Sequence, residues 1–396
     1  MAAVSAAALN MFLPSLPKMA DDFGVSYGII QFAIAGYLFL TAFAQLIIGP
    51  LSDRYGRRPV ALWTFGIFAL ASVGTALATS VIWFFIFRFL QATAVAGFVL
   101  SRAIIRDVHG PKNSASVIGY VTMGMALIPM VAPIFGGFLD DTLGWRATFW
   151  ALALFGAGLT FLVFIDSGET NTLKNASFME QFKGYPELFR SKRFWGYAMT
   201  GAFSVGAFFA YLTGAPLIGT KVFGMTPSQL GLAMGIPPTG YLIGNGLSGL
   251  LASRVGLNRM IMAGTIVQMA FLGCALIIAL IGVSSPWVFF AFLAGIGLGN
   301  GLILPSATTG VLNVRPHLAG SASGLSGAVA TLAGAVFSAF VAGILEVNLN
   351  AVVFAACIFG SAVLGFTGAV ITAYWCRKAD AEELRRATAE TSANPG

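Results

Sequence analysis

Charged residues are scarce in this chain of 396 residues, because Asp, Glu, Lys and Arg together make up only 9% of it. An ordinary soluble domain carries about a quarter charged residues. Hydrophobic residues reach 57% and the mean hydropathy is +0.85, so a folded chain of this length could not hide its apolar surface from water. The composition excludes a soluble globular protein and predicts a chain that folds in lipid.

Histidine and cysteine are also scarce, with two and three copies. His109 and His317 fall in predicted loops, where they are expected to be solvated. Cys274, Cys357 and Cys376 lie scattered in apolar segments, without the spacing of a metal site or a disulfide framework. We therefore expect no catalytic residues, no metal site, no cofactor and no enzymatic activity.

Long uncharged runs are what the chain does contain. A helix needs about 20 apolar residues to cross a hydrocarbon layer of about 30 Å. The runs are continuous rather than alternating with a period of two, which favours helices over barrel strands. We predict an all-α integral membrane protein whose twelve transmembrane helices lie near residues 1–17, 27–50, 59–79, 81–105, 114–139, 146–166, 194–220, 228–251, 260–282, 286–312, 319–344 and 350–376. The first run is short for a span, so we expect the natural chain to start further upstream.

The loop cations indicate how these helices are oriented. With an even number of spans, Lys18, Arg146 and Lys221 fall in loops of one side, and all other Lys and Arg residues outside the spans fall on the other side. Because positively charged loops stay in the cytoplasm, both termini are predicted to be cytoplasmic. The net charge of +7 is then a topology signal and implies no nucleic-acid partner.

One polar, mixed-charge stretch interrupts the apolar runs and divides the chain. It predicts an N-terminal six-helix bundle (1–166), a cytoplasmic linker (167–193), a C-terminal six-helix bundle (194–376) and a cytoplasmic tail (377–396). "GPLSDRYGRR" at 49–58 matches "GLLASRVGLN" at 249–258 in Gly, Leu, Arg and Gly. Internal repeats of this kind build many secondary transporters, so we expect two pseudo-symmetric bundles with the substrate site between them.

The turn at 49–59 concentrates charge between two uncharged runs. Gly49 and Gly56 allow helix ends to approach and turn sharply. Asp53 accepts hydrogen bonds and Arg54, Arg57 and Arg58 donate them, so a charged latch that forms in one conformation would bias a gate at this end. The alternative is that the basic residues serve only as a topology anchor.

Arg88 is the second charged anomaly, since it falls inside a predicted span. A charge within the membrane indicates a functional site unless its side chain reaches the interface. Gln91 lies three residues further on the same helical face. We predict that this pair faces the central cavity and handles protons or substrate, whereas Arg102, near the end of the span, is expected to reach the membrane surface.

The fifth predicted helix has a face almost bare of side chains. Ala132 and Gly136, and likewise Pro133 and Gly137, are four residues apart. Small residues at this spacing permit close helix packing, and proline removes a backbone donor and favours a kink. Ordinary helix packing would give the same pattern as a functional role.

Several motifs together resemble one family. "GPLSDRYGRRP" at 49–59 is similar to the signature between helices 2 and 3 of the major facilitator superfamily, and "RFLQATAVAG" from Arg88 is similar to its helix-4 motif. "GMALIPMVAPIFGG" at 124–137 resembles the helix-5 motif of drug:proton antiporters. With "LNMFLPSLP" (9–17), "GWRATFW" (144–150) and "RPHLAGSASGL" (315–325), the set resembles the bicyclomycin/chloramphenicol resistance (Bcr/CflA) family. The resemblance implies that helix 5 packs against helix 8 and limits leak.

Asn10 departs from that family. Many of these antiporters carry an aspartate in helix 1 before the "LPxLP" run, whereas an asparagine cannot take up a proton near neutral pH. The predicted spans hold no Asp or Glu away from their ends, which leaves Asp53, Asp107, Asp140 and Asp141 at helix ends as titratable candidates. The source of proton coupling is therefore open.

The sequence supports a monomeric drug transporter of a prokaryotic inner membrane, in contact with lipid. We expect it to export small, moderately apolar compounds by alternating access, with the proton gradient as energy source. Two alternatives are a pH-independent facilitator or importer of a small metabolite, and a non-transporting membrane sensor or scaffold. The predicted substrate cavity is lined by Asn10, Gln31, Tyr37, Gln91, Phe203, Phe208, Tyr211, Asn245 and Asn300.

Overall fold

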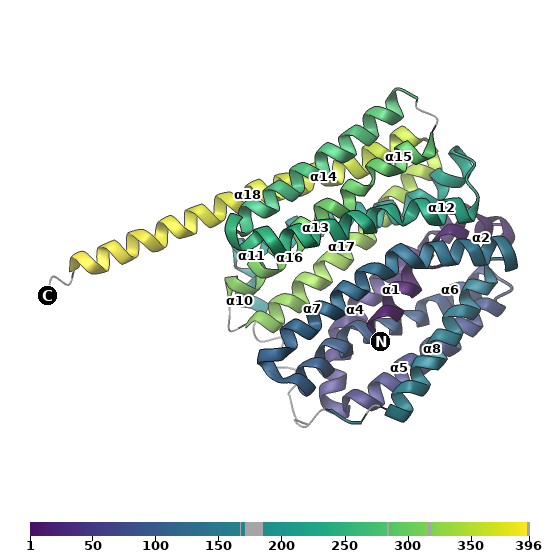
Figure 1. The fold of residues 1–396 in the computed structure, drawn as a ribbon, viewed down its shortest axis with the longest axis horizontal. Helices are drawn as coiled ribbons and strands as arrows, with labels where there is room; N and C mark the ends of the chain where they lie inside the picture. The colour runs from purple at the N-terminus through teal and green to yellow at the C-terminus, as the bar shows by residue number, and fades with distance from the viewer. Residues whose placement is uncertain (167, 171–184, 283–284, 316–317, 394–396) are drawn as a thin grey trace.

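The computed structural model is a helical bundle in two halves, which lie side by side with their helices roughly aligned (Figure 1). It describes residues 1–166, 168–170, 185–282, 285–315 and 318–393. The first half contains α1 (Ala2–Asn10), the 3-10 helix η1 (Leu13–Ser15), α2 (Leu16–Phe23), α3 (Tyr27–Ile30), α4 (Phe32–Tyr55), α5 (Arg57–Leu77), α6 (Val81–Leu90), the 3-10 helix η2 (Gln91–Val95), α7 (Ala96–Leu143) and α8 (Arg146–Asp166).

The second half repeats this all-helical construction. It contains α10 (Tyr185–Phe189), α11 (Lys192–Leu217), the π-helical turn η3 (Ile218–Val222), α12 (Pro227–Met234), α13 (Ile236–Val255), α14 (Leu257–Leu280), α15 (Pro286–Phe292), α16 (Ala294–Val314), α17 (Ala319–Val347) and α18 (Ala351–Ala393).

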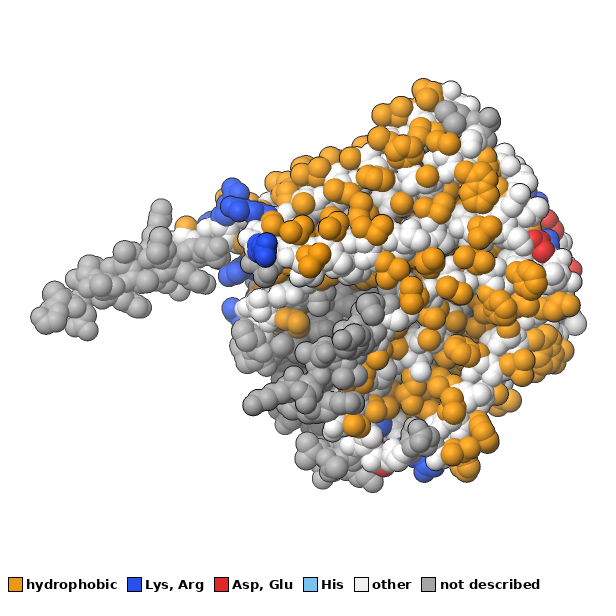
Figure 2. All heavy atoms as spheres, in the orientation of Figure 1, with side chains coloured by type: hydrophobic (Ala, Val, Ile, Leu, Met, Phe, Trp, Pro, Cys, Tyr) orange, Lys and Arg blue, Asp and Glu red, His pale blue; other side chains and the backbone are white. Residues whose placement is uncertain are grey.

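The predicted fold class is confirmed: the chain is an all-α membrane protein with twelve membrane-crossing segments. Within the described residues, nine helical segments are long and apolar enough to cross a bilayer. The other three are α1–η1–α2, the later arm of α7, and α12 with α13. Hydrophobic side chains cover the middle of the visible face, and Lys and Arg gather near the base of α18 (Figure 2). Trp63 and Leu70, with 73% and 74% of their surface exposed, fit a lipid-facing position.

Helix α7 continues through residues 106–113, where the sequence predicts a loop between the fourth and fifth spans. A Cβ built on Gly97 would overlap the carbonyl oxygen of Met1, and one built on Gly136 would overlap that of Met11. Ten residues of helix separate Met1 from Met11 by about 15 Å, whereas a straight helix from Gly97 to Gly136 would cover about 58 Å. The backbone of α7 therefore turns back on itself between these glycines, and its two arms form the predicted fourth and fifth spans.

Two predicted boundaries differ from the helices observed. Helix α18 continues through the predicted tail as far as Ala393 and projects beyond the bundle in Figure 1, since the sequence after Arg377 is rich in Ala, Glu and Arg, which favour helix. Of the predicted linker, residues 167 and 171–184 lie outside the described residues, and α10 lies near its end. The proposed division into bundles, linker and tail remains a prediction.

The internal repeat appears in the backbone geometry. Gly24 and Gly224 end equivalent helices with φ of 63° and 65°, and Gly56 and Gly256 join equivalent pairs of helices with φ of 102° and 90°. Only glycine adopts such angles without a steric penalty. The two halves are thus pseudo-symmetric, and the glycines of the charged turn have the predicted sharp-turn role at Gly56.

The two ends of the bundle are named here by residues that mark them. The Gly56 end carries the turns at Gly56 and Gly256, and the Lys18 end carries Lys18 and the turns at Gly24 and Gly224. This distinction matters because the inter-half hydrogen bonds and ion pairs found among the described residues lie at the Lys18 end.

Candidate functional site

Arg88 lies fully buried within the first half, with 0% of its surface exposed. Its Nε donates to the carbonyl oxygen of Ala33 at 3.2 Å, and its Nη1 donates to Oε1 of Gln91 at 2.6 Å. Gln91 in turn donates from Nε2 to Oγ of Ser72 at 2.9 Å. A continuous polar network therefore links α6, η2, α4 and α5 in the interior, and the side chain of Arg88 does not reach the membrane surface.

Two aromatic rings flank the guanidinium group. Its Cζ lies 4.2 Å from the ring centroid of Phe12 and 4.2 Å from that of Tyr37. Each cation–π contact contributes about 2 kcal/mol when the charge is desolvated. Nη2 of Arg88 has no hydrogen-bond partner among the described residues, so one donor direction remains available. The contribution of Phe12 was missed by the sequence analysis, because an apolar residue in a membrane helix carries no distinctive signal.

A second polar cluster occupies the other half. Asn300 on α16 is buried, and its Oδ1 accepts from Oγ of Ser204 on α11 and from Nε2 of Gln268 on α14, the latter at 3.3 Å. Three helices of the second half thus meet at one buried amide. The sequence analysis singled out Asn300 but not its partners, which lie far away along the chain.

The remaining predicted cavity residues are distributed between the two halves. Asn10 ends α1; its Nδ2 donates to the carbonyl oxygen of Ala6 at 2.8 Å, while its buried Oδ1 has no partner among the described residues. Asn245 donates to the carbonyl oxygen of its own helical turn at 2.9 Å. The aromatic members pack within the second half: Phe208 stacks on Tyr211 with centroids 6.4 Å apart, and Phe203 meets Phe337 edge-on at 6.1 Å. Whether these residues line one substrate cavity stays a prediction.

The bare face of the fifth span packs closely against two helices. A Cβ on Gly136 would overlap the carbonyl oxygen of Met11 in the same half, and a Cβ on Gly137 would overlap that of Pro227 in the other half. Reciprocally, a Cβ on Gly231 of α12 would overlap the carbonyl oxygen of Pro133. Backbone therefore meets backbone where α7 crosses α12, which begins the eighth span. This is the pairing that the family resemblance implied.

Polar contacts close the seam between the halves at the Lys18 end. Lys221 pairs with Asp21 at 3.1 Å, and the backbone nitrogen of Ser228 donates to Asp141 at 3.0 Å. Gln31 donates from Nε2 to the carbonyl oxygen of Thr213 at 2.7 Å. We call this set the Lys18-end seal.

Beside the seal lies Asp140, the single carboxylate with a buried side chain among the residues whose burial the structure describes. Its Oδ1 pairs with Nζ of Lys18 at 3.2 Å, and Oδ2 has no hydrogen-bond partner among the described residues. This carboxylate therefore lies next to the contacts that join the two halves.

The charged turn forms its ion pairs within the first half. Arg57 pairs through Nη1 with Asp53 at 2.5 Å and through Nε with Asp107 on α7 at 3.1 Å. Arg58 donates from Nη2 to the carbonyl oxygen of Phe164 at 2.8 Å, and the guanidinium of Arg54 lies 5.4 Å from the ring centroid of Tyr55. The ion pairs of Arg57 with Asp53 and Asp107 therefore tie α4, α5 and α7 together.

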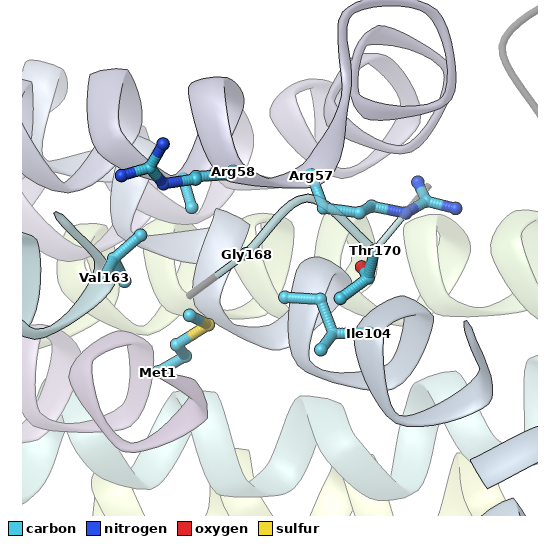
Figure 3. A pocket seen from close by; sticks show the side chains of 8 residues that line it. Met1, Arg57, Arg58, Ile104, Val163, Gly168 and Thr170 are labelled. Carbon is cyan, nitrogen blue, oxygen red and sulfur yellow. The ribbon is translucent and has the colours of Figure 1, made fainter. Parts of the chain in front are cut away.

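Glu169 is a further member of this region that the sequence analysis missed. Its carboxylate accepts from the backbone nitrogens of Arg57 at 2.8 Å and Arg58 at 3.3 Å, at the positive end of the α5 dipole. A cavity of about 210 Å³ lies beside it, where the side chains of Arg57 and Arg58 point in opposite directions (Figure 3). The start of the predicted linker is thereby attached to the charged turn.

Replacing Asp53 by asparagine tests whether the turn is a latch. We expect Asp53→Asn to lower transport several-fold while insertion stays normal, because the arginines that set topology remain and only the charge facing Arg57 is lost. Initial rates of transport in vesicles, normalised to inserted protein, measure the effect. Glu187→Gln, which removes a carboxylate paired with Arg315 at 2.5 Å in the other half, is the control. Unchanged transport by Asp53→Asn would reduce the turn to a topology anchor.

Comparisons with known proteins place the chain in a family. Residues 1–338 match the family model described as Major Facilitator Superfamily, so the chain belongs to that superfamily. It is 32% identical over 370 residues to an uncharacterized MFS-type transporter, YdgK, of Bacillus subtilis (strain 168), covering 91% of each chain. It is 28% identical over 341 residues to the bicyclomycin resistance protein homolog of Haemophilus influenzae, covering 84% of this chain and 85% of that one.

A solved structure supports the same fold. A point mutant of the nucleoside transporter NupG superposes with a TM-score of 0.73, covering 94% of this chain and 98% of that one, at 14% sequence identity. The resemblance to the Bcr/CflA type is confirmed, and the chain is a multi-pass bacterial membrane transporter rather than an enzyme.

Proposed function

We propose that this transporter exports small, moderately apolar, drug-like compounds across the inner membrane of a prokaryote. The observation that carries the proposal is the similarity, over most of both chains, to a protein named for bicyclomycin resistance. Most buried polar side chains of both halves, among the residues whose burial is described, are Ser and Thr hydroxyls or Asn and Gln amides, and such uncharged groups suit an uncharged substrate.

The Gly56 end is proposed to face the cytoplasm. It carries Arg54, Arg57, Arg58 and Arg254, and cytoplasmic loops retain positive charge. The Lys18-end seal would then close the molecule on the outer side, which corresponds to a state closed to the outside in an alternating-access cycle.

Release of substrate requires that the seal open, and its contacts are suited to this. The ion pair of Lys221 and Asp21 is largely exposed, and exposed pairs contribute only about 0–1 kcal/mol. The interface between α7 and α12 combines close backbone packing with the hydrogen bond that Ser228 donates to Asp141. A few weak contacts can be broken and remade in each cycle without a large energy barrier.

Proton antiport is proposed as the energy source, with Asp140 as the candidate carrier. Asn10 cannot titrate, whereas Asp140 is buried beside the seal and retains one unpartnered oxygen among the described residues. Protonation of Asp140 would remove the charge that faces Lys18 and so alter the end of α7 next to Asp141, which holds Ser228 of the other half.

Export can be tested by expressing the chain in an efflux-deficient host and measuring susceptibility to a panel of neutral and cationic drugs. We expect raised resistance to neutral compounds, and proton-driven export in everted vesicles that collapses with an uncoupler. Transport that ignores the pH gradient would favour the facilitator or importer alternative. No transport of any compound by correctly inserted protein would favour the sensor or scaffold.

Replacing Asn10 by aspartate tests the coupling scheme. The amide keeps its polarity in every state but carries no charge, so no anion at this position offsets the cost of desolvating a cation. We expect Asn10→Asp to extend export towards ethidium-like cations and to steepen its dependence on external pH. Asn10→Ser is the uncharged control. Steep proton-driven ethidium export by the unmodified protein, or no change in either property in Asn10→Asp, would contradict this scheme.

A further inference from the structure

A second cavity lies on the seam between the halves at the Lys18 end. It has a volume of about 420 Å³ and is formed by α3, Gln31 and the start of α4 on one side and by the last turns of α17 on the other. Its lining includes Gly28, Phe32, Ala339 and Ala342 together with the polar side chains of Ser26, Gln31 and Glu346. Cavities of about 300–1,000 Å³ hold small organic ligands. We call this space the α4–α17 crevice.

Gln31, which lines the crevice, carries a buried acceptor. It is 1% exposed, and its Nε2 is occupied by the carbonyl oxygen of Thr213. Its Oε1 has no hydrogen-bond partner among the described residues. A buried carbonyl oxygen without a donor costs free energy, so this position favours a ligand that supplies an N–H or O–H group.

Glu346 places a negative charge near that acceptor. A Cβ built on Gly28 would overlap its Oε2, so the carboxylate lies directly over the Gly28 backbone. Gly28 and Gln31 are three residues apart, a spacing that puts them on one helical face. Among the described residues, no ion pair is found for Glu346. The two polar groups together fit a cation that can donate a hydrogen bond.

Apart from Ser26, whose Oγ accepts a hydrogen bond from the backbone nitrogen of Ile29, the rest of the crevice lining is apolar. Ile29 and Phe32 line it and are 43% and 56% exposed, on a part of the surface that crosses the bilayer. Glu346 lies one residue before the end of α17, so its charge is at the level where the span ends. A ligand with its charged group at the membrane boundary and its chain directed into the bilayer matches this distribution.

We propose that the α4–α17 crevice binds a primary ammonium group carried on an alkyl chain. The ammonium would pair with the carboxylate of Glu346 and donate a hydrogen bond to Oε1 of Gln31, while the chain would follow Ile29 and Phe32. A quaternary ammonium carries the same charge but no N–H, so it would leave Oε1 of Gln31 unsatisfied. An ethanolamine phospholipid and an amphiphilic amine both present this chemistry.

Occupancy of the crevice would also affect the seal, because its walls belong to different halves. A ligand held by Gln31 and Glu346 bridges α4 and α17 beside the contact between Gln31 and Thr213. Such a ligand would favour the conformation closed at the Lys18 end. Binding itself does not depend on what the protein transports, so it can be tested apart from export.

The test uses the full chain purified in a non-ionic detergent. Tryptophan fluorescence or thermophoresis is followed during titration with dodecylammonium and, separately, with dodecyltrimethylammonium, whose chain has the same length. We expect at least tenfold tighter binding of the primary ammonium. Native mass spectrometry with dioleoyl phosphatidylethanolamine and phosphatidylcholine distinguishes the sources: preferential retention of the ethanolamine lipid indicates a lipid, and binding of dodecylammonium alone indicates an amphiphilic amine.

Two variants assign binding to the crevice. Glu346→Gln is expected to weaken dodecylammonium binding at least tenfold, whereas Asp22→Asn, which removes an exposed carboxylate paired with Arg146 at the same end, should leave it unchanged. Circular dichroism and size-exclusion profiles check that both variants fold. Equal binding of primary and quaternary ammonium, or full binding by Glu346→Gln, would overturn the proposal even if export is confirmed.

Discussion

Replacing Arg88 by alanine is expected to abolish transport, whereas Arg102→Ala should retain most of it. Removal of the Arg88 guanidinium deletes both cation–π contacts, with Phe12 and Tyr37, and leaves Oε1 of Gln91 without its donor. Each hydrogen bond to a charged group is worth about 1.5–3 kcal/mol, so losing these contacts should disrupt the packing of the helices around Arg88 in the first half. Arg102 is exposed, and its guanidinium lies over the ring of Phe98, with Cζ 3.9 Å from the centroid, near the surface of the bundle.

A loss of transport in these arginine variants must be distinguished from misfolding. Arg88→Lys keeps a positive charge but has no planar guanidinium to lie between two rings and donate in two directions, so we expect it to insert normally and transport at a small fraction of the original rate. Fluorescence-detected size exclusion reports folding, and vesicle uptake normalised to that signal reports transport. Equal tolerance of Arg88→Ala and Arg102→Ala would show that the buried network is not needed for transport.

Arg88 also shows how far sequence reasoning extends to a site. The position of a charge within an apolar run identified it, and the helical spacing to Gln91 identified one true partner. Phe12 and Ala33 could not be identified this way, because they are apolar or act through the backbone and come from other helices. Contacts between distant segments of a membrane helix bundle leave no periodic signal in the chain.

The number and type of the spans could be predicted from the sequence, whereas the interruptions within them could not. Apolar runs long enough to cross lipid determine the number of spans, since every backbone polar group must be satisfied within a helix. Interruptions such as η1 after α1 and η2 after α6 depend on packing with neighbouring helices. The continuous helical backbone of α7 through its reversal is likewise set by tertiary contacts, as the approaches of Gly97 and Gly136 to α1 show.

Only part of the charged turn could be predicted from the sequence. Asp53 and its neighbouring arginines were recognised because charged residues are concentrated there, and Asp53 does pair with Arg57. The carboxylates that complete the arrangement, Asp107 and Glu169, lie about 50 and about 112 residues from Arg57 along the chain. A loop with three arginines attracts any nearby acid, so the choice among acids depended on which helix ends the fold brings together.

Replacing Gly136 by alanine adds only one methyl group. We nevertheless expect it to have the second large effect on stability and export. The new Cβ would overlap the carbonyl oxygen of Met11, which is backbone and cannot rotate away, so α1 and α7 must separate. Overpacking of this kind typically costs about 1–3 kcal/mol, and here it moves the helix that ends in Asn10. We expect a lower melting temperature in detergent and at least a tenfold loss of export.

Two further alanine variants on α7 locate the cause. Around Gly124 the described structure leaves open space, so Gly124→Ala should be neutral or slightly stabilising, since alanine favours helix over glycine by about 1 kcal/mol. Gly137→Ala meets the carbonyl oxygen of Pro227 across the seam, so we expect a stable first half but a poorly closed Lys18 end. Proton leak through reconstituted vesicles should then rise in Gly137→Ala and stay at the control level in Gly124→Ala. If Gly137→Ala remains tight and Gly136→Ala exports normally, the close approach of α7 to its two neighbours serves neither transport nor the seal, and the small residues of this helix are packing alone.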